Sequence, residues 1–275
     1  SDLNFILFIL IYSMTNRIIY YYQTFVGLKN ILNSNNKVTH IHLSSIHFGD
    51  SNTPYIHLNN FSPYDAKFDS VWQDLKVAKE LGIKIILMVW GAGGAFQELF
   101  SNFNTNYSLL KELVLNKKDL IDGIDLDIEE EVNITDVEYL IKQLKTDFGS
   151  EFIISMAPIQ YSIENDVDGM GGFVYKELYL KVGSMIDYFN VQCYDDYSID
   201  AYSKMIKNGY PEDKIVMGSI SSQDLNSNLA VIKKLSQKYN KIGGVFNWEY
   251  YDSPPDPSNH GEWSQLMYNA LNSSN

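Results

Sequence analysis

The chain has 275 residues, a formal net charge of −13 at pH 7 and a pI near 4.7. This charge excludes nucleic acid or an anionic membrane surface as the main partner, because both repel an acidic protein. Hydrophobic residues make up 45% of the chain and aromatic residues 14%, enough for a large buried core. The single cysteine, Cys193, excludes an internal disulfide and a cysteine-ligated zinc site.

Residues 1–16 form an apolar segment ahead of the pattern that follows. The run from Leu3 to Met14 has the length of a signal-peptide core and is too short to span a membrane. No basic residue precedes it, and no small-x-small cleavage site follows. We interpret it as a packed extension, a remnant of an export signal or an engineered addition. The compartment stays open, with a slight preference for secretion.

From Arg17 onward, short apolar runs alternate with helical patterns. The runs predict strands at 17–22, 40–45, 83–89, 122–129, 152–157, 188–194, 215–220 and 243–248. Periodicity and capping residues predict helices at 28–33, 70–81, 96–100, 107–115, 135–148, 173–182, 200–208, 225–239 and 264–271. The loop at 46–64 has room for a small hairpin. Eight strands alternating with helices predict one α/β domain over residues 17–275, a (β/α)8 TIM barrel.

The stretch from Asp122 to Glu129 alternates acidic and apolar residues. In a strand, Asp125, Asp127 and Glu129 share one face, about 7 Å apart along the chain. A solvated acidic face is the simpler reading, but a parallel strand between helices is usually buried on both sides. Carboxylates confined together resist joint ionisation, so we expect at least one to hold its proton near neutral pH. Such a set can cleave a glycosidic bond.

The strands of a TIM barrel carry function at their carboxyl ends. Candidate residues there are Glu129, Met156, Gln192, Tyr194, Asp195 and Trp248. Carboxylates and amides suit the hydroxyls of a sugar, and aromatic rings suit its faces. Asp122 lies off the alternating frame, so we expect a structural role for it.

At these residues the chain resembles glycoside hydrolase family 18, the chitinases and endo-β-N-acetylglucosaminidases. The family signature Asp-x-x-Asp-x-Asp-x-Glu is matched by Asp122, Asp125, Asp127 and Glu129. The run Ser155-Met156-Ala157-Pro158, the group Gln192-x-Tyr194-Asp195 and Trp248 also match family positions. The resemblance extends from about Arg17 to Leu271. Between the last two predicted strands there is room for one helix only, so we expect no α+β insertion domain there.

The resemblance implies a role for each catalytic position. Glu129 would be the general acid and then the base. Asp127 would orient the acetamido group of the substrate, whose oxygen attacks the anomeric carbon, and Asp125 would tune Asp127 from below. Tyr194 would donate a hydrogen bond to the acetamido oxygen, and Trp248 would form the floor under the sugar ring. No cofactor and no metal are implied.

Further substrate-binding residues are expected at Gln192, Asp195, Met156 and Tyr20. The family often has a serine that supports the inner aspartate, and Met88 stands at that position here. We therefore expect Asp125 to take a hydrogen bond from Tyr20 or Tyr22.

The pair His40 and His42 has the spacing of a metal site in barrel hydrolases. Such sites need further histidines on later strands, and none occurs between His57 and His260. We therefore expect a structural role for this pair.

The resemblance implies retaining, substrate-assisted hydrolysis of β-1,4 bonds in N-acetylglucosamine polymers such as chitin or chitooligosaccharides. One alternative is a chitinase-like lectin that binds the sugar without cleaving it; such lectins typically replace the glutamate that Glu129 matches. Another is an endo-β-N-acetylglucosaminidase that acts on N-glycans. The expected partner is an oligo- or polysaccharide containing N-acetylglucosamine, and the oligomeric state is open.

Overall fold

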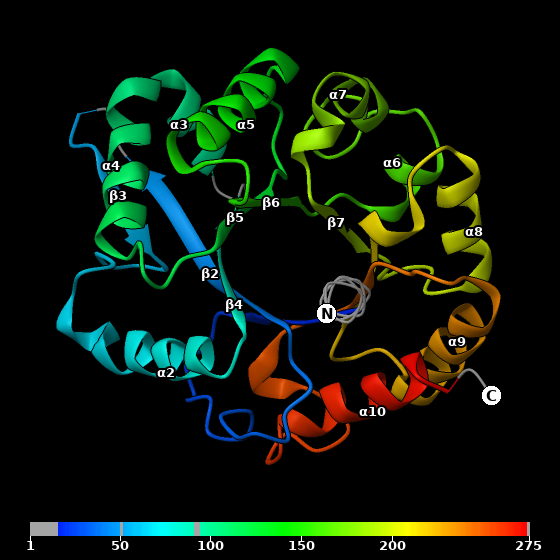
Figure 1. Cartoon of the computed structure of the whole chain (residues 1–275). Coiled ribbons are helices and arrows are strands. Elements are labelled where there is room, and N and C mark those ends of the chain that lie inside the picture. Colours follow the sequence, from blue (N-terminus) through cyan, green and yellow to red (C-terminus); the bar gives the residue numbers. More distant parts are fainter. Residues whose placement is uncertain (1–15, 50–51, 91–93, 274–275) are drawn as a thin grey trace, which may run out of the picture.

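The protein is a closed barrel of eight parallel strands surrounded by helices (Figure 1). A computed structural model describes residues 16–49, 52–90 and 94–273, so almost all of the apolar segment predicted at 1–16 lies outside the described residues. The barrel strands are β1 (Arg17–Tyr22), β2 (His40–Gly49), β4 (Lys84–Trp90), β5 (Gly123–Asp127), β6 (Ile153–Met156), β7 (Tyr188–Gln192), β8 (Ile215–Ile220) and β9 (Gly244–Trp248). The strand β1 pairs with both β9 and β2, and this second pairing closes the ring. The predicted TIM barrel is confirmed.

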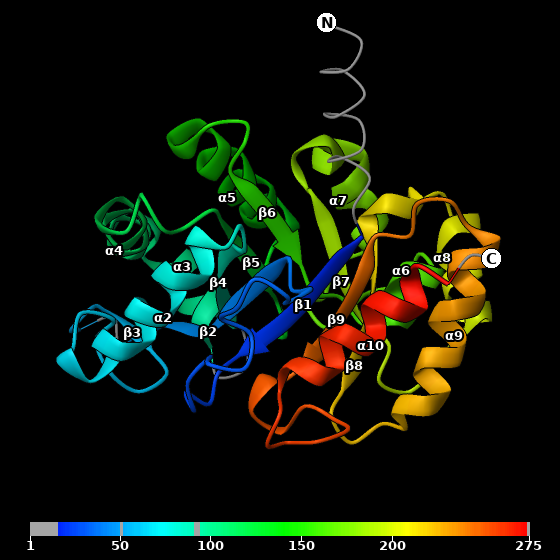
Figure 2. The same ribbon diagram turned by 60° about the horizontal axis from the view of Figure 1, so that its bottom comes forward.

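Helices lie outside the strand ring (Figures 1 and 2). They are α2 (Asp69–Glu80), α3 (Ala95–Ser101), α4 (Phe103–Asn116), α5 (Ile134–Phe148), α6 (Gln160–Glu164), α7 (Tyr175–Val182), α8 (Ile199–Lys207), α9 (Leu225–Lys238) and α10 (Gly261–Leu271). Short 3₁₀ turns are η1 (Ala66–Phe68), η2 (Gly183–Met185), η3 (Glu212–Lys214) and η4 (Tyr250–Asp252). Between β8 and β9 the chain contains α9 and its turns, so no insertion domain separates these strands.

The strands bury both faces, because side chains alternate between the barrel interior and the layer under the helices. The larger core cluster fills that outer layer and includes Tyr20 and Tyr22 of β1. A smaller cluster fills the interior and consists of Ile19, Tyr21, Met88, Tyr188, Val216 and Phe246. Four partly buried side chains pack against this smaller cluster: Trp90, Ile153, Tyr194 and Trp248.

One predicted helix is replaced by turns, and the structure adds one helix that was not predicted. The segment 28–33 forms turns instead of a helix, because asparagine side chains capture backbone groups there: Asn33 Oδ1 accepts from the Asn35 amide at 3.0 Å. The predicted loop at 46–64 does contain a hairpin, in which β3 (Tyr55–Leu58) pairs antiparallel with β2. The helix α6 lies in a stretch that the sequence pattern left without an element.

Within residues 16–49, 52–90 and 94–273, no helix combines the length and the apolarity needed to cross a membrane.

Gly123 begins the acidic strand in close contact with the next strand. A Cβ at this position would lie 2.2 Å from the backbone oxygen of Ile153. We predict that Gly123→Ala lowers the free energy of unfolding by about 3 kcal/mol, the upper range for overpacking, because backbone cannot move aside like a side chain. Urea unfolding measures the difference.

The control for this substitution is Gly82→Ala. No atom lies within 4 Å of a Cβ built at Gly82, although its φ of +89° favours glycine. The cost there should be about 1 kcal/mol, for backbone strain alone. Equal losses in the two variants would contradict the steric explanation.

Candidate active site

A pocket of about 280 Å³ opens at the carboxyl ends of the strands. Its lining consists of Gln23, Trp90, Asp127, Glu129, Gln192, Tyr194 and Trp248. Five of these seven residues were predicted from the sequence; Gln23 and Trp90 were not. A larger hollow of about 530 Å³ lies between α2 and residues 116–120 at the end of α4, and its charged side chains do not converge on one buried point, so chemistry favours the smaller pocket.

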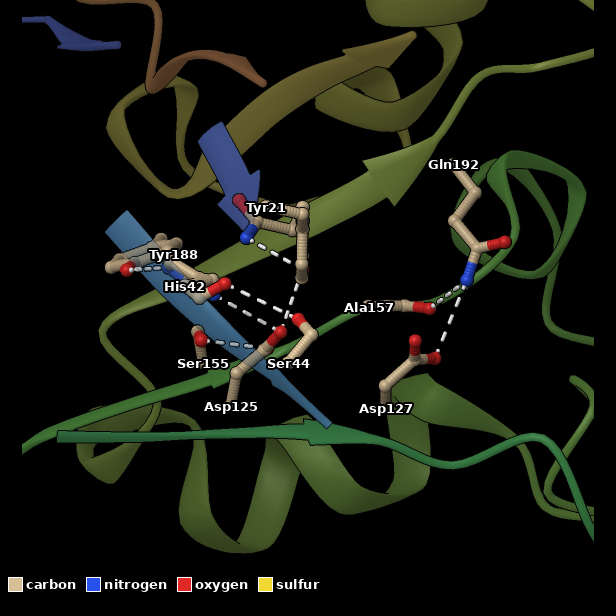
Figure 3. A network of polar contacts seen from close by, with 10 residues as sticks. Tyr21, His42, Ser44, Asp125, Asp127, Ser155, Ala157, Tyr188 and Gln192 are labelled. Carbon is tan, nitrogen blue, oxygen red and sulfur yellow. Dashed lines mark hydrogen bonds and ion pairs between the residues drawn. The ribbon is translucent and has the colours of Figure 1, made fainter. Parts of the chain in front are cut away.

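Glu129 follows directly after β5 and is held by two neighbours. Trp90 Nε1 donates to Glu129 Oε2 at 3.1 Å. Gln192 Nε2 lies 3.4 Å from Glu129 Oε1 and 3.4 Å from Asp127 Oδ1, and it donates to the carbonyl oxygen of Ala157 at 2.8 Å. The amide of Gln192 therefore bridges the two carboxyl groups from the side of β7, and Figure 3 shows its contacts with Asp127 and Ala157.

Asp127 is almost fully buried, with 5% of its surface exposed. Burial raises its pKa well above the ordinary value, and the nearby Glu129 and Asp125 raise it further. Asp127 is thus the carboxyl group that retains a proton as the pH rises. The direction of this shift agrees with the expectation that one acid of the set holds its proton, which stays a prediction.

Asp125 lies below Asp127 and is completely buried. The Tyr21 hydroxyl donates to Asp125 Oδ2 at 2.6 Å, and the Ser155 hydroxyl donates to Oδ1 at 2.7 Å. His42 Nδ1 lies 3.1 Å from Oδ2. Figure 3 shows these three side chains reaching Asp125 from three other strands.

The prediction that Tyr20 or Tyr22 supports Asp125 is wrong. Both point out of the barrel: the Tyr20 hydroxyl donates to the carbonyl oxygen of His260, and the Tyr22 hydroxyl accepts from the Gly27 amide. Tyr21, between them, points inward. A shift of one residue along a strand moves a side chain to the opposite face, so the error is one of parity.

Two further predicted binding residues do not reach the pocket. Met156 is fully buried in the outer core, on the face of β6 opposite to Ser155. Asp195 follows β7 and is exposed to solvent. Tyr20, also predicted to bind substrate, packs against Trp263 under the helices.

Aromatic rings form the walls of the pocket. The ring centroids of Trp90 and Trp248 are 6.0 Å apart, and Tyr194 stacks on Phe246 at 6.2 Å. Burial raises the pKa of Tyr194 well above its usual value, and Asp127 and Glu129 add to the shift. Its hydroxyl therefore keeps its hydrogen and can donate it to a ligand.

Glu249, next to Trp248, holds the loop after β1. Its Oε2 accepts from the backbone amides of Gln23 at 2.7 Å and Thr24 at 3.0 Å, and its Oε1 accepts from the Thr24 hydroxyl at 2.7 Å. This clamp fixes Gln23 at the rim of the pocket. The sequence gives no periodic signal for Gln23, because it lies in a loop.

Asp122 and Cys193 lie outside the pocket. Asp122 forms an ion pair with Lys79 and accepts from the Ile85 amide at 2.9 Å, so it ties β5 to α2 and β4. Burial raises the pKa of the Cys193 thiol to about 12. A thiol of that acidity stays protonated and unreactive.

His40 and His42 do not form a metal site with other residues. Among the described residues, no group of three histidine, cysteine, aspartate or glutamate side chains is arranged to hold a metal ion. His42 instead contacts Asp125, a contact that the sequence did not indicate. The alternation of β2 places His42 on the same inward face as His40. Its partner Asp125 lies 83 positions further along the chain, so a local pattern could not reveal the contact.

Known proteins resemble this chain in sequence and in fold. The model of Glycosyl hydrolases family 18 matches residues 17–253. A curated protein named Chitinase 2, from Rhizopus oligosporus, is 24% identical in an alignment of 237 positions that covers 74% of this chain and 40% of that protein. The chain therefore spans less than half the length of this relative.

Two solved structures are similar over most of their length. One is a fungal endo-beta-N-acetylglucosaminidase from glycosyl hydrolase family 18, with a TM-score of 0.85 and 28% identity, covering 94% of this chain and 99% of that one. The other is the chitinase ChiC from Aspergillus fumigatus, with a TM-score of 0.82 and 28% identity, covering 88% and 94%. Because the family match spans the barrel, the acidic strand and every residue that lines the pocket, the chain belongs to family 18 of the glycosyl hydrolases.

Proposed function

We propose that the protein hydrolyses β-1,4 bonds of N-acetylglucosamine polymers, chitin or chitooligosaccharides, with retention of configuration. The observation that carries this proposal is the series of carboxyl groups along one face of the acidic strand: Glu129 at the pocket, Asp127 with a raised pKa next to it, and Asp125 fully buried. Membership of family 18 supports the acetamido group of the substrate as the attacking group, in place of a nucleophile from the enzyme.

Each side chain has one step in this proposal. Glu129 donates its proton to the leaving oxygen while the acetamido oxygen attacks the anomeric carbon. Asp127 accepts a hydrogen bond from the acetamido N–H, and its own proton faces Glu129, where it reduces repulsion once Glu129 is ionised. Tyr194 donates to the acetamido oxygen. Glu129 then takes a proton from the incoming water, and the carboxyl groups return to their first state.

A non-catalytic lectin on the same barrel fits the pocket less well. Binding alone does not require a glutamate that is held by both Trp90 and Gln192 beside a protonated aspartate. An enzyme that cuts the chitobiose core of N-glycans would break the same bond between N-acetylglucosamine units. Assaying a chitooligosaccharide beside a high-mannose glycoprotein separates these two substrates.

The first prediction concerns the acid. Glu129→Gln should preserve folding and sugar binding and lose at least about 10²-fold in kcat, the usual scale of general acid catalysis. The matched control is Glu131→Gln, an exposed glutamate two positions further along, which should keep wild-type turnover. Near-normal turnover of Glu129→Gln would remove Glu129 from the acid role.

The second prediction concerns the nucleophile. Attack by the acetamido oxygen inverts the anomeric carbon once and water inverts it again, so the first product must be the β-anomer. A fully deacetylated oligosaccharide has no such group and should not be cleaved. NMR of the initial product measures the anomer, and an α-product would rule out this mechanism.

The third prediction concerns the buried proton of Asp127. Because its pKa is raised, the folded protein holds a proton that the unfolded chain releases above the ordinary value of 3.8. The free energy of unfolding therefore decreases as the pH rises from about 4 toward the raised pKa of Asp127. Asp127→Asn cannot ionise, so its stability relative to wild type should increase with pH over this window.

Urea unfolding between pH 4 and pH 8 tests this expectation. The control is Asp195→Asn, the same substitution at an exposed position, which should follow the wild-type curve. Parallel curves for Asp127→Asn and the wild type would show that Asp127 is ionised as easily in the folded state as in the unfolded chain.

A further inference from the structure

His42 is a buried titratable residue that the proposed mechanism does not use. It has no exposed surface, and it lies in the barrel interior at the level of Asp125. Tyr21 and His42 are paired in register on β1 and β2, so the two side chains point inward from adjacent positions. Their ring centroids are 4.9 Å apart.

The two ring nitrogens of His42 have different partners. Nε2 lies 2.8 Å from the hydroxyl oxygen of Tyr188. Nδ1 lies 3.1 Å from Asp125 Oδ2, within ion-pair distance, but it has no hydrogen-bond partner in the described part of the chain. If the Tyr188 hydroxyl donates to Nε2, the hydrogen of the neutral ring lies on Nδ1, where Asp125 is the nearest charged group.

The groups around His42 favour this arrangement. The titratable or charged groups that face it or its partners are Tyr21, Asp125, Tyr188, the His40 of its own strand, and Arg17 behind the Tyr188 ring. Burial lowers the pKa of His40 well below its usual value, and the charges of Arg17 and Lys84 lower it further, so His40 stays neutral. Burial raises the pKa of Tyr188, so its hydroxyl keeps its hydrogen and can donate it to His42 Nε2.

Because of Met88, Asp125 depends on donors from strands other than β4. It is paired with Asp125 in register on β4, and its thioether offers no hydrogen to the carboxylate. Asp125 instead receives hydrogens from Tyr21 and Ser155, and it faces His42 Nδ1. Negative charge on Asp125 is one of the causes that hold the proton on Asp127.

We propose that His42 is a positioning residue of the catalytic carboxyl groups: its Nδ1 hydrogen stabilises negative charge on Asp125 and so keeps the shared proton on Asp127, where the reaction uses it. This role rests on the proposed function. His42 does not touch the substrate, because Asp125 and Asp127 lie between it and the pocket. It stabilises the negative charge of Asp125 and, through Asp125, affects the protonation of Asp127.

Two neutral substitutions separate the nitrogens of His42. An asparagine amide reaches about as far as Nδ1, so His42→Asn keeps a donor toward Asp125 and loses the contact with Tyr188. A glutamine amide reaches about as far as Nε2, so His42→Gln keeps the contact with Tyr188 and loses the donor. His40→Gln is the matched control, since His40 lies on the same strand and face and its polar partner is Thr39.

We expect His42→Gln to lose about 10-fold or more in kcat with less than about 3-fold change in KM, because the proton moves from Asp127 toward Asp125. The carboxyl ¹³C titration of Asp127 should move to lower pH by about one unit, the scale of one lost donor to a charged group. His42→Asn should recover most of the rate and of the titration, and His40→Gln should match the wild type within about 2-fold. Equal losses in His42→Asn and His42→Gln, or wild-type values in both, would overturn the proposal.

The ¹⁵N spectrum of His42 in the wild-type protein provides a test that needs neither a stable variant nor activity. The proposal requires a hydrogen on Nδ1 throughout the pH range of activity, and a bare Nδ1 would refute it. If the spectrum and the Asp127 titration behave as expected but no substrate is cleaved, the proposed function fails and the role of His42 in the proton's position stands. If Glu129→Gln is inactive and His42→Gln equals the wild type, the role of His42 fails alone.

Discussion

The site depends on the mutual repulsion of acids that one strand forces into one buried column. The alternation of β5 brings Asp125 and Asp127 to the same face, and both are almost inaccessible to water. Two negative charges buried two positions apart on one strand are strongly unfavourable, so the pair holds a proton. The raised pKa of Asp127 indicates that this proton is on the carboxyl group nearer the pocket. The remaining polar groups of the interior arrange themselves around this distribution of charge.

Side chains of the barrel interior donate to Asp125, the deeper acid. Asp127, nearer the pocket, has fewer protein donors and is available to a ligand. Tyr21, Ser155 and His42 surround Asp125, and Asn190 donates in turn to the Tyr21 hydroxyl at 3.0 Å. Above this layer, Gln192 is the amide that contacts both Asp127 and Glu129. A carboxylate with several donors is stabilised as an anion, whereas one with few is ready to exchange a proton. The depth of each acid in the barrel therefore separates its role from that of its neighbour.

Some carboxylates near the rim of the pocket hold loops in place and take no part in the proposed reaction. Glu249 binds the backbone after β1 and thereby sets Gln23, and Glu130 accepts from the Phe96 amide at the beginning of α3. Carboxylates near a site are thus not all reactive. Those that accept several backbone hydrogens are occupied in fixing loops, and Glu129 differs from them because its partners are side chains that a substrate can displace.

The sequence by itself determined the barrel and the acidic strand through local periodicity, and five of the seven pocket residues through their places at strand ends and their match to family motifs. It did not determine which tyrosine of β1 turns inward: three tyrosines in a row satisfy either parity, and Tyr21 meets Asp125 across 104 positions of sequence. His42, Ser155 and Trp90 likewise acquire their roles only when the ring of strands closes and brings β2, β4 and β6 to β5. The tertiary structure decided these contacts, because hydrogen bonds across a barrel depend on the register and curvature of several strands. A short stretch of sequence does not determine either quantity.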